Sequence, residues 1–138
     1  MTKKIVVFGL GRIGGAIGEL LCRNDQYQVI GADTNVNAVK NYANKFDTRL
    51  SESNVFSGIL QGQDAVISAL TFNENPLLAQ AALDAGCSYF DLTEDVACTK
   101  AIQDVAKHAV KGQVFMPQCG LAPGFIGILA YSFRKLFD

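Results

Sequence analysis

The chain has 138 residues, which is the usual size of a single domain. Its hydrophobic fraction of 49% supports a packed core and excludes intrinsic disorder. The 12 basic residues nearly balance the 13 acidic ones, which excludes the clustered positive charge that binding to nucleic acid or to an anionic membrane surface requires.

The four cysteines and the one histidine form no C-x-x-C pair and no other zinc-binding spacing. We therefore expect no metal site, and reduced thiols in a cytoplasmic protein. The charged start Met1–Lys4 and the apolar run after it could begin a signal peptide, but glycines and Arg12 interrupt the run early and no cleavage site follows. No apolar run approaches the roughly 20 residues of a membrane span.

Short apolar runs alternate along the chain with longer segments of helical period. The predicted strands are Lys4–Phe8, Gln28–Asp33, Thr48–Leu50, Ala65–Ala69, Ser88–Leu92 and Gln113–Met116. The predicted helices are Arg12–Asn24, Asn35–Lys45, Ser53–Gln61, Asn75–Ala85, Val96–Lys111 and Phe125–Phe137. Ile5–Phe8 and Ala65–Ile67 are apolar throughout, which is typical of strands that helices cover on both faces. The pattern predicts a doubly wound α/β fold of three layers (αβα), with a six-stranded parallel sheet of order 3-2-1-4-5-6.

Three dipeptides mark predicted helix boundaries. Asn75-Pro76 offers an N-cap followed by a proline at the first helical position. Ala85-Gly86 and Lys111-Gly112 each place a glycine where helices commonly end.

The residues Gly9-Leu10-Gly11-Arg12-Ile13-Gly14 form a G-x-G-x-x-G motif between the first predicted strand and the first predicted helix. A dinucleotide-binding turn requires this context, whereas the glycines alone would be a weak signal. The first glycine permits a tight turn, the second lets the backbone approach a diphosphate, and the third lets helix and strand pack closely. Free N–H groups near Arg12 and Ile13 would point at the phosphates. A glycine-rich turn that binds nothing is the alternative interpretation.

Asp33 ends the second predicted strand, about 20 residues after the motif. A carboxylate here accepts hydrogen bonds from the hydroxyls of an adenosine ribose and repels a 2′-phosphate. The following residues, Thr34–Asn37, contain no Lys or Arg that would compensate such a phosphate. The sequence therefore favours NAD over NADP, with Asp33 and Thr34 in contact with the cofactor. Capping of the next helix by Asp33 is the alternative, and it is compatible with this role.

Two further segments reach the same edge of the predicted sheet, because parallel strands end there together. Ala69 and Leu70 follow the core of the fourth predicted strand, and we expect their backbone to contact the cofactor. Asp91 closes the fifth strand, followed by Thr93 and Glu94, and these residues could touch the nicotinamide ribose or a substrate amine. Simple packing in the first segment and helix capping in the second are the alternatives.

Four blocks of the sequence carry a resemblance to a known family: Val7–Gly15, Asp64–Leu70, Ala85–Glu94 and Cys119–Phe125. Together they resemble the cofactor domain of the saccharopine dehydrogenase-like oxidoreductases over nearly all of the chain. The first block is common to many dinucleotide-binding (Rossmann) domains. The strand end Tyr89-Phe90-Asp91 and the turn Gly120-Leu121-Ala122-Pro123-Gly124 are more specific.

The resemblance implies hydride transfer between a nicotinamide cofactor and an amino-acid-derived amine or imine. It also implies that the turn Gly120–Gly124 lies near the nicotinamide and leads into a substrate-binding domain. Members of this family also use NADP, so the preference for NAD rests on Asp33. The chain ends shortly after the turn, so we expect it to lack that domain and to be catalytically incomplete.

No catalytic acid or base is assigned from the sequence. Cys119 could line the nicotinamide pocket, but it has no basic neighbour and is interpreted as a small buried side chain. His108 is explained by a favourable position near the end of a helix.

We divide the chain into a dinucleotide-binding domain, residues 1–124, and an apolar C-terminal helix, residues 125–138. The apolar side chains of this helix spread around its whole axis, which is typical of a buried helix. The sheet can cover one side of it. We therefore expect the other side to pack against a second copy, a separate subunit or a further domain.

A second resemblance points to another class of protein. Potassium-channel regulatory domains, which sense nucleotides, have a similar length and a similar opening of strand, Gly-Leu-Gly-Arg and helix, with an acid that ends the second strand. They offer no explanation for the turn Gly120–Gly124. A domain that binds the cofactor without taking part in catalysis is a third possibility.

Overall fold

The computed structural model describes residues 1–137; Asp138, the last residue of the predicted C-terminal segment, lies outside them. Its elements are β1 (Lys3–Phe8), α1 (Arg12–Cys22), β2 (Tyr27–Asp33), α2 (Val36–Tyr42), β3 (Asp47–Leu50), α3 (Ser57–Leu60), β4 (Ala65–Ser68), α4 (Asn75–Ala85), β5 (Ser88–Asp91), α5 (Val96–Ala106), β6 (Phe115–Met116), α6 (Phe125–Phe133) and a 3₁₀ turn at Arg134–Leu136. The strands form one sheet in the order β3-β2-β1-β4-β5-β6, and neighbouring strands pair in parallel. The predicted fold class and strand order are confirmed.

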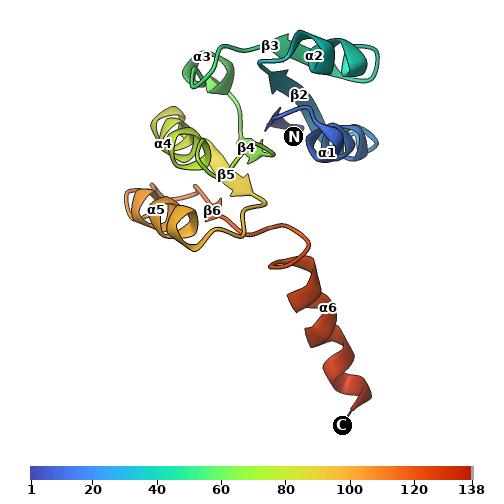
Figure 1. Cartoon of the computed structure of the whole chain (residues 1–138), viewed down its shortest axis with the longest axis vertical. Helices are drawn as coiled ribbons and strands as arrows, with labels where there is room; N and C mark the ends of the chain where they lie inside the picture. The colour runs from blue at the N-terminus through green and yellow to red at the C-terminus, as the bar shows by residue number, and fades with distance from the viewer. Residues whose placement is uncertain (138) are drawn as a thin grey trace.

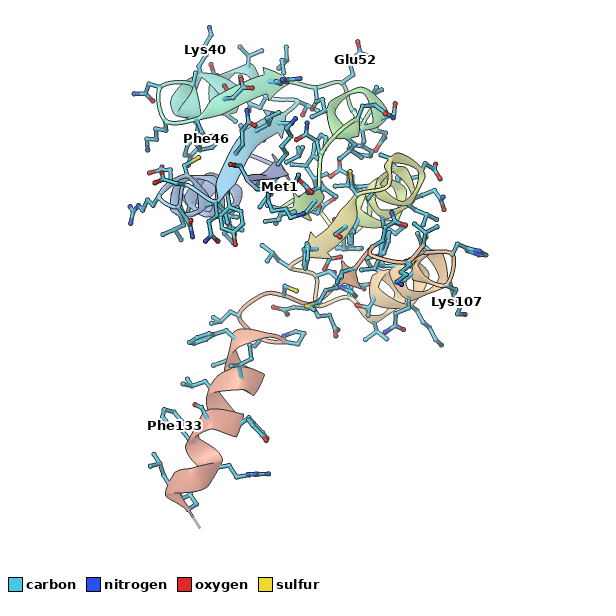
Figure 2. The ribbon with its side chains drawn as sticks, turned by 180° about the vertical axis from the view of Figure 1, so that it is seen from behind. Met1, Lys40, Phe46, Glu52, Lys107 and Phe133 are labelled. Carbon is cyan, nitrogen blue, oxygen red and sulfur yellow. The ribbon has the colours of Figure 1, made fainter. Side chains whose placement is uncertain are left out.

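Helices lie on both faces of this sheet, and each face has its own core. Figure 1 shows α1 and α2 on one side, next to β1–β3, and α3, α4 and α5 on the other. The core under α1 and α2 contains Val7, Leu10, Val29 and Phe46. Phe46, labelled in Figure 2, lies so close to α1 that a Cβ on Gly18 would be 2.6 Å from its ring. The larger core under α3–α5 includes Phe8, Val66, Leu78, Tyr89 and Ile102.

The helices bury the strands unequally. Ile5–Phe8 of β1 is buried on both faces, as its apolar run predicts. In β4 only Val66 and Ser68 are buried, while Ala65 and Ile67 are half-buried, so the prediction of burial on both faces is wrong for Ala65–Ile67. The reason is that α1 and α2 cover the β1–β3 half of their face, which leaves the β4–β6 half of that face open.

Several helix boundaries differ from the predicted ones. Asn75 is not an N-cap: Glu74 has that position, and Asn75 is buried, with Oδ1 accepting a 2.6 Å hydrogen bond from the hydroxyl of Ser68. Gly86 ends α4 in the left-handed conformation (φ +77°), as predicted. Gly112 also has a positive φ (+102°), but α5 has already ended at Ala106. This glycine therefore lies in a loop and does not end the helix, contrary to the prediction.

Shorter elements account for most of the other differences. α3 is a single turn, Ser57–Leu60, within the longer helix predicted there. β6 has only two residues, Phe115 and Met116, which pair with Tyr89 and Phe90 of β5. The helices α1 and α2 end at Cys22 and Tyr42, two or three residues before their predicted ends.

α6 does not pack against the sheet, contrary to the expectation that the sheet covers one of its sides. None of its residues is buried. It runs away from the α/β body (Figure 1), and its side chains, the labelled Phe133 among them, extend where no other element of residues 1–137 lies (Figure 2). Within residues 1–137, no helix has the length and apolar composition that crossing a membrane requires.

Candidate functional site

The turn between β1 and α1 is built from glycines with different physical roles. Gly9 has φ +89°, a conformation that side chains rarely adopt. A Cβ on Gly14 would lie 1.8 Å from the carbonyl oxygen of Gly9, so only glycine permits this close approach of helix and turn. A Cβ on Gly11 would meet no atom within 4 Å. Neither the backbone conformation nor the packing requires glycine at position 11.

The space in front of Gly11 adjoins the first turn of α1. Gly11 is the N-cap, and no side chain caps this helix end. The first N–H groups of a helix, here those of Arg12 and Ile13, have no partner within the helix and carry the positive end of its dipole. Arg12 and Ile13 are both exposed. An open space, free N–H donors and an adjacent cationic side chain fit a diphosphate group.

Asp33 lies beside this turn. Its Oδ2 accepts a 2.6 Å hydrogen bond from the N–H of Leu10, and its Oδ1 accepts a 2.7 Å bond from the N–H of Asn35. The N-cap of α2 is Asn35, not Asp33, so the alternative role as helix cap is wrong. Asp33 and Thr34 line a hollow of about 100 Å³ that Leu70 also borders.

A cleft of about 500 Å³ lies on the other side of the turn, at the carboxyl ends of β4 and β5. Five of the predicted residues line it: Ile13, Ala69, Leu70, Thr93 and Glu94. The rest of its lining comes from the segments that follow β4 and β5 and from the start of α4: Thr71, Phe72, Asn75, Leu92 and Asp95. The charged groups among these residues are the carboxylates of Glu94 and Asp95.

Sequence reasoning missed Thr71, Phe72, Asn75, Leu92 and Asp95 as part of this cleft. Thr71 and Phe72 could have been found, because they directly follow a strand that ends at the same edge as the glycine turn. Asn75 carried no such signal, since the bond between its side chain and Ser68 depends on how the chain folds. Asp95 is the N-cap of α5, with Oδ1 accepting a 2.6 Å bond from the N–H of Cys98. Capping ahead of Val96 is therefore done by Asp95 and not by Asp91, Thr93 or Glu94.

Asp91 does not face the cleft, contrary to the predicted contact of this residue with the cofactor. It is fully buried (0% exposed). Oδ2 accepts a 2.9 Å hydrogen bond from the hydroxyl of Tyr89, and Oδ1 accepts bonds of 3.0 Å from the N–H groups of Thr93 and Gln118. Burial, and secondly the neighbouring carboxylate of Asp91, raise the pKa of Tyr89. The tyrosine therefore stays a protonated donor.

Cys119 is exposed, so its interpretation as a small buried side chain is wrong. Its Sγ donates a 3.2 Å hydrogen bond to the carbonyl oxygen of Met116. Partial burial of the thiol, and secondly the charge of Asp91, raise its pKa above the usual value. A thiol with a raised pKa is a poor nucleophile at neutral pH.

A doubly wound parallel sheet, a glycine turn leading into a helix, an acid at the end of β2 and a cleft beyond β4 define a Rossmann domain of the dinucleotide-binding class. The comparison with known families agrees with this class. A family model described as "Saccharopine dehydrogenase NADP binding domain" matches residues 5–116. The chain belongs to this family of cofactor-binding domains of saccharopine dehydrogenase-like oxidoreductases.

Individual relatives are distant. The chain is 23% identical over 134 residues to alpha-aminoadipic semialdehyde synthase, mitochondrial, from Rattus norvegicus, covering 93% of this chain and 14% of the relative. It is 28% identical over 92 residues to glutamyl-tRNA reductase from Thermoplasma acidophilum, covering 67% of this chain and 22% of the relative. Among solved structures, apo saccharopine dehydrogenase (L-Glu forming) from Saccharomyces cerevisiae superposes with a TM-score of 0.80 at 18% identity, over 94% of this chain and 30% of that one. The chain thus spans less than a third of each of these relatives.

Proposed function

We propose that NAD(P) lies along the carboxyl edge of the sheet, with its diphosphate in front of Gly11 and the N–H groups of Arg12 and Ile13. The adenosine half then lies in the hollow beside Asp33 and Thr34, and the nicotinamide half enters the cleft past Ala69 and Leu70. The open space at Gly11, where a Cβ would meet no atom within 4 Å, is the observation that carries this proposal. Gly9, Leu10 and Gly14 contribute by shaping the turn.

The proposal includes a preference for NAD over NADP. The family is described as NADP-binding, so this preference depends on Asp33. Both carboxylate oxygens of Asp33 accept backbone hydrogen bonds, which holds the negative charge next to the turn. A 2′-phosphate on the adenosine ribose would approach that charge. No Lys or Arg follows within Thr34–Asn37 to offset the repulsion.

The reaction served by the domain is hydride transfer to or from an amino-acid-derived imine or amine. Membership in the family supports this, as does the cleft, whose charged lining residues are Glu94 and Asp95. Such a lining favours a cationic substrate nitrogen over an anionic group. This chain supplies the cofactor site, and the residues that select the substrate belong to a further domain. The cytoplasmic location stays a prediction.

α6 carries the contact with that domain or with a second copy of the chain. Its side chains Phe125, Ile126, Ile128, Tyr131 and Phe133 are 47–71% exposed. A contiguous apolar surface of this kind marks an interaction site.

Calorimetric titration of the chain with NADH, NADPH and ATP tests the cofactor proposal. The wild type should bind NADH more tightly than NADPH. Asp33→Asn removes the charge and keeps one of the two oxygens that accept backbone N–H bonds, so it should bind NADH about tenfold more weakly and lose the discrimination against NADPH. Asp25→Asn, in an exposed turn, is the matched control and should behave as the wild type. Tight binding of ATP without preference for a nicotinamide dinucleotide would instead favour a nucleotide-sensing module.

A further inference from the structure

The buried carboxylate of Asp91 connects two segments that are far apart in the sequence. Thr93 belongs to the wall of the cleft, whereas Gln118 belongs to the segment between β6 and the turn Gly120–Gly124. The N–H groups of both residues donate to the same oxygen, Oδ1, at 3.0 Å. The backbone adds a third link, because the carbonyl oxygen of Asp91 accepts a 2.8 Å bond from the N–H of Cys119.

The surroundings of Asp91 make these hydrogen bonds strong and their loss costly. The carboxylate has no exposed surface, and the donors that the structure gives it are two backbone N–H groups and the hydroxyl of Tyr89. Hydrogen bonds to an ionised acceptor are about twice as strong as neutral ones, and an N–H left without its acceptor in the interior is costly. Gln118 has φ +65°, a conformation that a non-glycine residue rarely adopts. The bond from its N–H to Asp91 helps to hold that conformation.

We propose that Asp91 is a positioning residue for the nicotinamide half of the cofactor, because its carboxylate fixes the Thr93 wall of the cleft relative to the segment that leads into α6. It does not touch the cofactor. The inference rests on the proposed function, since it assumes that the nicotinamide enters this cleft. The adenosine half lies beside Asp33, on the other side of the glycine turn, where Asp91 makes no contact.

The test compares the binding of NADH and of ADP by calorimetry, since ADP lacks the nicotinamide half. Asp91→Ala removes all three acceptor contacts. We expect it to weaken NADH binding about tenfold while changing ADP binding less than about twofold. Asp91→Asn keeps Oδ1 for the two N–H groups, and its amide can donate to the oxygen of Tyr89. As a neutral acceptor it should recover a part of the NADH affinity that Asp91→Ala loses. Asp25→Ala is the exposed control.

The outcomes separate this inference from the proposed function. If the wild type binds both ligands and Asp91→Ala weakens both equally or neither, the positioning role is wrong and the cofactor site stands. If the wild type binds neither ligand, both proposals fail. If Asp91→Ala does not fold, hydrogen exchange of the backbone amides in the wild type decides. Slow exchange at Thr93 and Gln118 supports the proposal that Asp91 holds these two segments together. Exchange as fast as that of free loop amides overturns it.

Discussion

At the scale of single residues, one glycine of the turn is required by the fold, whereas another is explained by ligand binding. Gly14 is required by packing, because any side chain there would meet the carbonyl of Gly9. Gly11 faces open space and has a φ of −69°, which any residue adopts. A substitution at Gly11 should therefore report on the ligand, and one at Gly14 on the fold.

Gly11→Ala should cost less than about 1 kcal/mol of unfolding free energy, the usual range for a changed N-cap. It should nevertheless weaken NADH binding at least about tenfold, because the new methyl group occupies the space of the diphosphate. Gly14→Ala should lower the unfolding free energy by about 2 kcal/mol or more, since the Cβ would overlap backbone atoms. Urea unfolding and calorimetric titration measure the two effects. Wild-type NADH affinity in Gly11→Ala would contradict the placement of the diphosphate.

At the scale of elements, α5 begins at the wall of the cleft. Asp95 both lines the cleft and caps the helix through its bond to the N–H of Cys98. The hydroxyl oxygen of Thr93 in turn accepts a 3.2 Å bond from the N–H of Asp95. The local order of this wall and the start of α5 are thus coupled.

Asp95→Ala should lower the unfolding free energy by about 1 kcal/mol, the typical value of a lost side-chain cap. Asp95→Ser, which can still accept from the helix N–H groups, should recover most of this loss. Glu94→Ala is the matched control, because Glu94 is exposed and is not the cap. Urea unfolding checks all three variants. Equal stability of Asp95→Ala and Glu94→Ala would show that the cap does not contribute.

The elements that could be predicted from the sequence are those whose signals are local. The opening of strand, glycine turn, helix and strand-end acid has all its determinants within Lys3–Asp33. The inward orientation of Asn75 and Asp91 depends on partners that only the fold supplies, such as Gln118, 27 residues from Asp91. The early end of α5 was missed for a related reason: apolar residues such as Val110 continue the helical period, but the chain turns after Ala106 toward the short β6.

At the scale of the whole molecule, apolar surfaces are left uncovered in two places within residues 1–137. One is α6, and the other is the β4–β6 half of the sheet face that carries α1 and α2. Ile67, Phe90 and Met116 lie side by side in register on that half. Met116 is 50% exposed, whereas Val7 on β1 is fully buried (0% exposed). Figure 1 shows that the segment joining the body to α6 follows β6.

Sedimentation velocity over a concentration series should reveal self-association of the isolated chain through α6. Ile128→Asp places a charge on the most exposed of the α6 residues named above and should shift the chain toward monomer. Val96→Asp, which changes an equally exposed apolar residue on α5, should leave the association as it is in the wild type. A wild-type chain that sediments as a monomer at every concentration would contradict the prediction.

The parallel direction of every strand pair also fixes where attachments can be made without disturbing the site. Met1 lies at the amino edge of the sheet, just before β1. The six residues of β1 span about 20 Å, so this edge lies a full strand length from the glycine turn. A purification tag, dye or surface linker joined at Met1 is thus expected to lie about one strand length from the proposed cofactor site.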